Sequence, residues 1–348
     1  MEGFGGSDVD VSVIVPTRNR AGWLAECLDT LAAQQTTARY EVLVVNNASE
    51  DETATLIEER SGDDPRFRPL YEERLGRSAA MNTGIAEARG RLILFTDDDV
   101  LVDERWIDAY ASLLTRRPEV DLAGGPIYPI PRHTRWPRWY DDVASSSIGS
   151  IDYGGERVLT GLENVWGANM AVRSDLFARV GTWAEDLGVR GTFHPNKVDP
   201  SRNEDTEFQQ RVTQAGGTVW FCPEARIRHR VNVPGPRTCL EKGVSNGMTS
   251  WHRPPSSAAP TDRRRGPHST AAWVALVLSA TRFAAWSLWF RVLPTARAFR
   301  RAWLAGWMVG WRLEDLTGGV RTTRPDVRIR LVIFRIIRLA LRMAPWRA

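Results

Sequence analysis

The chain has 348 residues, of which 43% are hydrophobic and 25% are charged. That length and composition fit one large globular domain with a smaller one, and they exclude a wholly disordered, collagenous or coiled-coil chain. Three cysteines without paired spacing exclude a disulfide framework and a cysteine zinc site, so we expect a reducing compartment. The net charge of +4 is unevenly distributed, since residues 261–348 contain 17 Arg and four acidic residues. A basic end after an acidic body predicts contact of that end with anionic lipid or another polyanion.

Apolar runs alternate with segments of helical spacing over the first hundred residues. The pattern predicts strands over residues 9–15, 40–45 and 92–96. It predicts helices over residues 21–34, 51–60 and 78–88, with Ser49 capping the second. This alternation is typical of an α/β fold with a doubly wound, mostly parallel sheet and helices on both faces. Ligands bind such sheets at the carboxyl ends of the strands, and these ends carry polar clusters at residues 17–20, 46–51 and 97–99.

The pattern is looser beyond residue 120. Residues 126–140 and 187–203 predict long loops, the first with some irregular strand, and loops of this length are usually functional. A helix is expected over residues 204–215, with short strands over 218–222 and 225–231. Pro, Ser and a basic cluster mark residues 252–270 as a linker. We therefore predict a domain over residues 1–251, a linker over 252–270 and a basic, Trp-rich, amphipathic helical region over 271–348.

Three consecutive carboxylates, Asp97, Asp98 and Asp99, end the third predicted strand. They repel one another, and a divalent cation such as Mg²⁺ or Mn²⁺ would offset that repulsion because it prefers oxygen ligands. The alternative is a solvated acidic turn. The apolar strand that runs directly into the carboxylates favours the cation.

Further motifs have both a functional and a structural interpretation. Glu204 and Asp205 open a helix, where acids favour the positive end of the dipole, and one of them can act as a general base. His229 is either a structural residue or a metal ligand. Gly167 either lets the backbone approach a ligand closely or forms a simple turn before an apolar, helix-like stretch. Asn82 either meets a ligand or is an ordinary helix residue.

Other nucleotide-binding and hydrolase motifs are absent from the sequence. There is no GxGxxG after the first strand, no GxxxxGK(S/T) and no GxSxG. The dinucleotide-binding fold, the P-loop NTPases and the α/β-hydrolases are therefore not expected.

Taken together, six motifs over roughly residues 11–231 resemble the family 2 glycosyltransferases, which have the GT-A fold. The motifs are residues 16–20, 44–51, 76–85, 95–99, 167–170 and 203–205. Two positions depart from the family pattern. Asn46 stands where an Asp is common. Met81 stands where an Arg often precedes the Asn, which removes a predicted contact with phosphate, and Arg77 can supply that contact instead.

The resemblance implies an inverting enzyme that uses Mn²⁺ or Mg²⁺ and a UDP-, GDP- or dTDP-sugar. Asp205 would be the catalytic base, with Glu204 as the alternative, and the metal would be held by Asp97, Asp99 and His229. The residues implied for the nucleotide sugar are Pro16, Thr17, Arg18, Asn19, Asn47, Arg77, Asn82, Asp97 and Asp98. The residues implied for the acceptor and sugar side are Trp166, Gly167 and Asn169.

The C-terminal region has the pattern of an interfacial membrane helix. Over residues 328–343, Arg328, Arg335, Arg338 and Arg342 share one helical face and most of the rest is apolar. No stretch has the roughly 20 apolar residues of a membrane span, so we expect the region to lie on the membrane. The alternative is a helical subdomain packed on the main domain or on a second subunit of a homo-oligomer. By analogy, a peripheral site at the cytoplasmic face of the membrane would suit a lipid-linked or polysaccharide acceptor.

Three rival functions compete with this interpretation. A sugar-phosphate nucleotidyltransferase would need a Gly-rich, basic phosphate loop that is not evident. A non-catalytic sugar-nucleotide or glycan-binding protein would not need Asp97, Asp99, Asp205 and His229 together. A nucleic-acid binder is not expected, since the body is acidic and the basic end is more apolar than a phosphate-binding arm requires.

Overall fold

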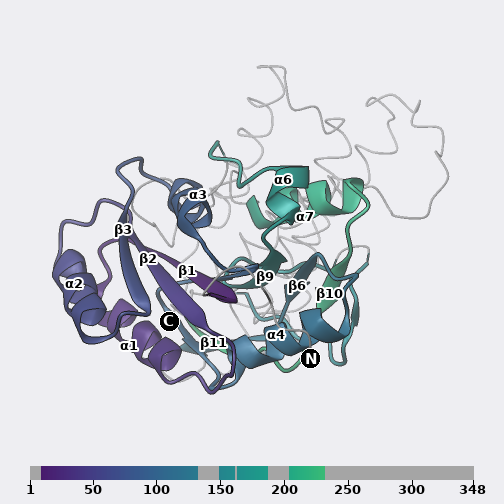
Figure 1. Ribbon diagram of the computed structural model, residues 1–348, viewed down its shortest axis with the longest axis horizontal. Coiled ribbons are helices and arrows are strands. Elements are labelled where there is room, and N and C mark those ends of the chain that lie inside the picture. The colour runs from purple at the N-terminus through teal and green to yellow at the C-terminus, as the bar shows by residue number, and fades with distance from the viewer. Residues whose placement is uncertain (1–8, 132–148, 161–162, 187–203, 232–348) are drawn as a thin grey trace, which may run out of the picture. The chain divides into compact units, whose positions relative to one another are not determined.

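A computed structural model describes residues 9–131, 149–160, 163–186 and 204–231 (Figure 1). An eight-stranded sheet has the order β3-β2-β1-β4-β9-β6-β10-β8, and a three-stranded sheet has the order β5-β11-β7. The strands of the large sheet are β1 (Val11–Thr17), β2 (Tyr40–Asn46), β3 (Phe67–Tyr71), β4 (Leu92–Thr96), β6 (Leu122–Gly124), β8 (Arg157–Val158), β9 (Asn169–Arg173) and β10 (Val219–Phe221). Those of the small sheet are β5 (Val100–Val102), β7 (Ile127–Pro131) and β11 (Ile227–Val231). The helices are α1 (Ala21–Ala32), α2 (Thr53–Asp63), α3 (Arg77–Glu87), α4 (Trp106–Arg116), α6 (Leu176–Val180) and α7 (Glu204–Gln214).

The large sheet is mostly parallel, as the sequence predicts. Strand β1 pairs in parallel with β2 and β4, β2 pairs in parallel with β3, and β10 pairs in parallel with β6. The residues of β2 and β4 are all buried, which is typical of parallel strands covered on both faces. Strand β9 runs antiparallel between β4 and β6, and so joins the two halves of the sheet.

Several predicted elements differ from the structure. The segment after Gly167 forms strand β9 and not a helix, because its apolar residues pair with β4 and β6. Helix α2 begins at Thr53, and its backbone N–H is bonded by the carboxylate of Asp51 at 3.1 Å, so the expected Ser49 cap is wrong. Part of the expected loop over 126–140 is strand β7, while residues 132–140 and the expected loop over 187–203 lie outside the described residues.

An aromatic cluster attaches α7 to the centre of the sheet. The ring of Trp183 stacks on Phe208 of α7 with centroids 4.6 Å apart, and it meets Phe95 of β4 edge-on at 5.5 Å. Burial of such rings contributes strongly to packing. The first turn of α7 is therefore held close to the residues that follow β4.

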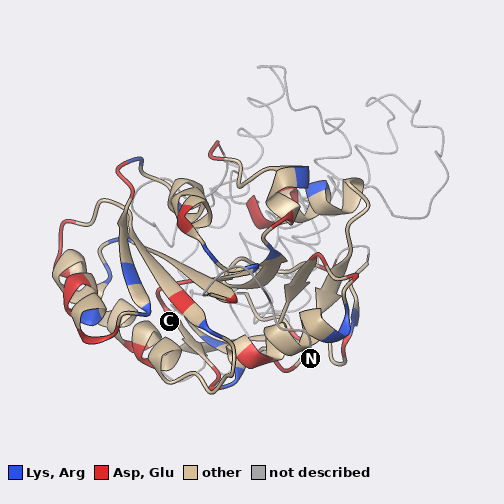
Figure 2. Cartoon of the chain, viewed as in Figure 1, with Lys and Arg blue, Asp and Glu red and all other residues tan. Residues whose placement is uncertain are grey.

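The described elements carry both signs of charge on their outer surfaces (Figure 2). Acidic residues lie on the outer helix α2 as well as after β4 and at the start of α7. Among the described residues, no helix has the length and apolar character needed to cross a membrane. The predicted boundaries at 251 and 270 and the C-terminal helices fall outside these residues and stay predictions.

Candidate active site

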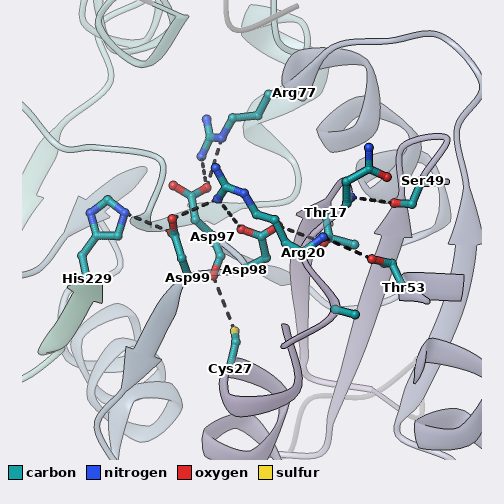
Figure 3. Close-up of polar contacts among 12 residues, drawn as sticks. Thr17, Arg20, Cys27, Ser49, Thr53, Arg77, Asp97, Asp98, Asp99 and His229 are labelled. Carbon is teal, nitrogen blue, oxygen red and sulfur yellow. Dashed lines mark hydrogen bonds and ion pairs between the residues drawn. The ribbon is translucent and has the colours of Figure 1, made fainter. Parts of the chain in front are cut away.

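Three potential metal ligands meet where β4, β5 and β11 come together (Figure 3). One ligand atom from each of Asp97, Asp99 and His229 lies within 4.8 Å of the others. His229 pairs with Val100 in the small sheet, so backbone hydrogen bonds bring it beside Asp99 although 130 residues separate them. The predicted juxtaposition of these three side chains is thus present in the structure.

The histidine and the aspartate are in direct contact. Nε2 of His229 lies 3.0 Å from Oδ1 of Asp99. Burial lowers the pKa of His229, but the hydrogen bond and charge of Asp99 outweigh burial and leave that pKa above its usual value. Two carboxylates and an imidazole are donors that suit Mn²⁺, and the carboxylates alone suit Mg²⁺. The residues present therefore fit the metal that the fold implies.

The middle carboxylate of the triplet points into the protein. Asp98 accepts hydrogen bonds from the hydroxyl of Thr17 and from Nη1 of Arg20, each at 2.8 Å (Figure 3). Burial raises its pKa to about 6, although Arg20 opposes that shift. The side chains of Asp98 and Thr17 thus bond to each other and join the end of β1 to the triplet, and their contacts with the nucleotide stay predictions.

Arg77, the first residue of α3, touches three carboxylates from two other elements. Its Nη2 and Nε donate to Oδ1 of Asp97 at 2.7 and 3.1 Å. Its Nη1 lies 3.3 Å from Oε1 of Glu204 and 3.6 Å from Oδ1 of Asp205. The guanidinium therefore joins a potential metal ligand to the acidic pair that opens α7.

The two carboxylate oxygens of Asp205 differ in their hydrogen bonding to the described part of the chain. Oδ2 accepts from the backbone N–H of Gly167 at 3.0 Å, whereas Oδ1 is buried and has no hydrogen-bond donor among the described residues. Burial raises the pKa of Asp205 to about 7, the charge of Glu204 adds to the rise, and Arg77 opposes it. A carboxylate with a pKa near neutrality is suited to take a proton at physiological pH.

The side chains around residue 167 leave no room for a residue larger than glycine. A Cβ at this position would lie 2.8 Å from Nη2 of Arg77 and 2.9 Å from Oδ1 of Asp205. The backbone at Gly167 is thus close to Asp205 and Arg77, while its predicted approach to a ligand stays a prediction.

Both polar atoms of the Asn47 side chain form hydrogen bonds within the protein. Its Nδ2 donates to the carbonyls of Glu72 and Arg74 at 2.9 and 2.8 Å, and its Oδ1 accepts from the N–H of Gly76 at 2.9 Å. These bonds fix the loop that leads into Arg77. The nucleotide contact of Asn47 stays a prediction, while the observed bonds of its amide are all to this loop.

Asn82 and Asn169 are likewise engaged internally. The amide of Asn82 makes two hydrogen bonds with the backbone of Trp183, at 3.0 and 2.9 Å. Asn169 is completely buried and accepts from Trp106 and Tyr110, while its Nδ2 donates to two backbone carbonyls. These bonds engage both atoms of the amide within the protein, and the acceptor-side role of Asn169 stays a prediction.

The remaining predicted ligand contacts lie at the carboxyl end of β1 and before β9. Asn19 has φ 52° and links two loops, since its Oδ1 accepts from the N–H of Glu50 at 2.7 Å. Nε and Nη1 of Arg18 are buried without a hydrogen-bond partner in the described part of the chain. Pro16 and Trp166 are partly buried, and Trp166 packs against the core. Their contacts with a ligand stay predictions.

Residues 12–181 match the profile of glycosyl transferase family 2. The match identifies residues 12–181, just under half of the chain, as a family 2 glycosyltransferase domain. The chain is 29% identical over 214 residues to the glycosyltransferase AglE of Haloferax volcanii, which covers 61% of this chain and 64% of AglE. It is 22% identical over 223 residues to the glucosyl-dolichyl phosphate glucuronosyltransferase of the same organism, which covers 64% of this chain and 69% of that protein. The chain thus spans less than two thirds of the length of AglE.

A solved structure shows the same fold. The crystal structure of GalNAc-T7 with UDP, GalNAc and Mn²⁺ has a TM-score of 0.50 and 14% sequence identity, and it covers 67% of this chain and 47% of that one. At that identity the likeness shows the fold alone. The GT-A fold expected from the motifs is thereby confirmed for the family 2 domain.

Two side chains that hold the candidate site together, Arg20 and Gln209, have contacts that no sequence motif indicates. Arg20 lies in the polar cluster after β1, but its partners Asp98 and Asp99 are almost 80 residues away in sequence. Gln209 of α7 bonds the backbone of Val165 and Glu163, at 3.0 Å each, and so holds the segment before Gly167. An Arg directly before a helix and a Gln within one are common, so neither position carries a signal by itself.

Proposed function

We propose that this chain is an inverting, metal-dependent glycosyltransferase that moves a sugar from a nucleoside diphosphate to a hydroxyl group. The observation that carries the proposal is the contact of Arg77 with Asp97 on one side and with Glu204 and Asp205 on the other. The potential metal ligands and Asp205, a base with a pKa near 7, thereby form one connected site.

Asp205 is the base of the proposed reaction. It takes the proton of the acceptor hydroxyl as that oxygen bonds to the anomeric carbon, and the bond from this carbon to the diphosphate breaks with its electron pair leaving on the diphosphate. Attack opposite the leaving group inverts the anomeric centre. Glu204 is less suited to the role, because its Oε1 already accepts from Arg77 at 3.3 Å.

Asp97, Asp99 and His229 would hold the metal ion. When bound, Mn²⁺ or Mg²⁺ would supply Lewis-acid stabilisation of the negative charge that develops on the departing diphosphate. Arg77 adds a positive charge beside Asp97, where it can stabilise the same group. The presence of UDP and Mn²⁺ in the GalNAc-T7 structure supports this assignment.

The proposed acceptor is a lipid-linked or polysaccharide glycan at the cytoplasmic face of a membrane. The relative from Haloferax volcanii is named as a glucosyl-dolichyl phosphate glucuronosyltransferase, which supports a lipid-linked acceptor. The 17 Arg and seven Trp of residues 261–348 support contact with a membrane surface.

The test is turnover of a donor panel by the full chain. UDP-, GDP- and dTDP-sugars are incubated with Mn²⁺, with and without lipid-linked acceptors, and nucleoside diphosphate release is followed. We expect release from one donor, lost on chelation and reduced about 10²–10⁴-fold in Asp205→Asn. Asp108→Asn is the matched control, since Asp108 of α4 pairs with Arg105, an exposed residue directly before that helix.

A different result would favour the non-catalytic alternative. A nucleotide sugar that binds tightly with no release in any combination, and binds equally well to Asp205→Asn, would contradict the proposed enzyme and indicate a sugar-nucleotide-binding protein.

A further inference from the structure

The guanidinium of Arg20 lies against the carboxylates of Asp98 and Asp99 (Figure 3). A single nitrogen, Nη1, bonds Oδ1 of Asp98 at 2.8 Å and Oδ2 of Asp99 at 2.9 Å. These carboxylates are buried, with side-chain exposures of 6% and 7%, while that of Arg20 is 27%. Bonds of this charge-assisted kind are among the stronger ones in proteins.

The position of Arg20 is fixed by its own backbone. It is the residue that caps α1, and its carbonyl accepts from the N–H groups of Trp23 and Leu24, both at 3.0 Å. Its N–H donates to the hydroxyl of Thr53 at 3.3 Å. Its guanidinium lies over the ring of Trp23, 5.5 Å from the centroid. Arg20 is therefore held in place and can orient a carboxylate that bonds to its guanidinium.

The two oxygens of Asp99 have different partners. Oδ2 bonds Arg20, and Oδ1 faces Nε2 of His229 at 3.0 Å. The backbone carbonyl of Asp99 also accepts from the N–H of Arg230 at 2.9 Å, so the main chain of this residue is held as well as its side chain. With Oδ2 occupied, Oδ1 is the oxygen that remains directed toward the metal-ligand group.

We propose that Arg20 is a positioning residue that orients Asp99 so that its Oδ1 binds the metal together with Asp97 and His229. This inference rests on the metal site of the proposed function. Residues that orient metal ligands in this way usually change metal affinity by about 10–100-fold when they are removed.

The direction in which metal affinity changes when Arg20 is replaced distinguishes a positioning role from a purely electrostatic one. Arg20 is a cation beside a cation site, so if only its charge mattered, removing it would strengthen metal binding. Positioning gives the opposite result, because a carboxylate without Arg20 is free to turn away from His229. Arg20→Met, which keeps the length and removes the charge and the donors, therefore discriminates between the two.

The experiment is a titration of the full chain with Mn²⁺ alone, in which free Mn²⁺ is measured by electron paramagnetic resonance. We expect Arg20→Met to bind Mn²⁺ about 10–100-fold more weakly than wild type and Arg20→Lys to be intermediate. Arg105→Gln, at an exposed ion pair of α4, is the matched control and should bind as wild type does. Unchanged or tighter binding by Arg20→Met would overturn the inference.

A second variant covers the loss of folding that an uncompensated Asp98 would cause. In Arg20→Met/Asp98→Asn the buried charge is removed, so thermal stability should recover relative to Arg20→Met while Mn²⁺ affinity stays low. Recovery of both would overturn the inference, since the role of Arg20 would then be to neutralise Asp98.

Asp99→Ala separates this inference from the proposed function. If wild type binds Mn²⁺, Asp99→Ala does not, and Arg20→Met binds normally, the metal site stands and only the role of Arg20 fails. If wild type binds no Mn²⁺, the metal site and the role of Arg20 both fail.

Discussion

Replacing Gly167 with alanine tests how closely the base and Arg77 must be placed. The added Cβ would lie 2.8 Å from Nη2 of Arg77 and 2.9 Å from Oδ1 of Asp205. An ordinary contact requires about 3.5 Å, so both groups must retreat by roughly 0.6 Å. Since a displacement of about 1 Å can cost 10²-fold in rate, we expect kcat to fall by about 10–100-fold.

The stability of Gly167→Ala should change much less than its activity. The atoms that must move are the ends of two side chains, so we expect a loss of about 1–2 kcal/mol in the free energy of unfolding. The measurement is kcat for nucleoside diphosphate release with the donor found in the panel, together with a denaturant unfolding curve. Gly62→Ala on α2, where a Cβ meets no atom within 4 Å, is the control and should keep kcat.

One result would refute the reasoning behind this prediction. A folded Gly167→Ala variant with the kcat of wild type would show that the spacing between Arg77 and Asp205 is not part of the reacting centre.

Further predictions concern the pH dependence, the internal asparagines and the metal. Because the pKa of Asp205 is raised to about 7, kcat should increase as pH rises through about 7, while the free energy of unfolding should fall between about pH 4 and 7. In rate and melting profiles, Asp205→Asn should remove the rate trend and lessen the stability trend, of which Asp98 with its pKa of about 6 keeps a part. Asn169→Ala leaves Trp106 and Tyr110 without their acceptor, so thermal unfolding should show a loss of about 2–5 kcal/mol. Asn47→Ala frees the loop before Arg77, and steady-state kinetics should show a lower kcat. Chelation of divalent cations should abolish release, and added Mn²⁺ should restore it; release that persists in chelator would contradict the metal site.

The sequence predicts those elements whose pattern depends only on neighbouring residues. Strands β1, β2 and β4 are nearly continuous apolar runs, and the carboxylates at the end of β4 stand out because no packing interaction explains them. Strand β3 was not predicted, since its sequence FRPLY contains an Arg and a Pro and its burial alternates. Its place at the edge of the sheet tolerates both residues.

The roles of the asparagines could not be predicted in the same way. Asn47, Asn82 and Asn169 stand in motifs that indicate ligand contact, yet each amide bonds the protein itself. The partners of Asn169 are 43 to 63 residues away in sequence, so they are known only once the strands are paired. What the motifs do predict is which segments meet, and Asp97, Asp99 and His229 do meet.

Binding of nucleoside diphosphates in the presence and absence of Mn²⁺ tests the central claim most directly, because it needs neither acceptor nor sugar. UDP, GDP and dTDP are titrated into the full chain by calorimetry, with Asp99→Ala alongside. The account predicts that one of them binds at least about tenfold more tightly with Mn²⁺, and that Asp99→Ala loses this gain. Binding that is equally tight without metal, or no binding of any of the three, would contradict it.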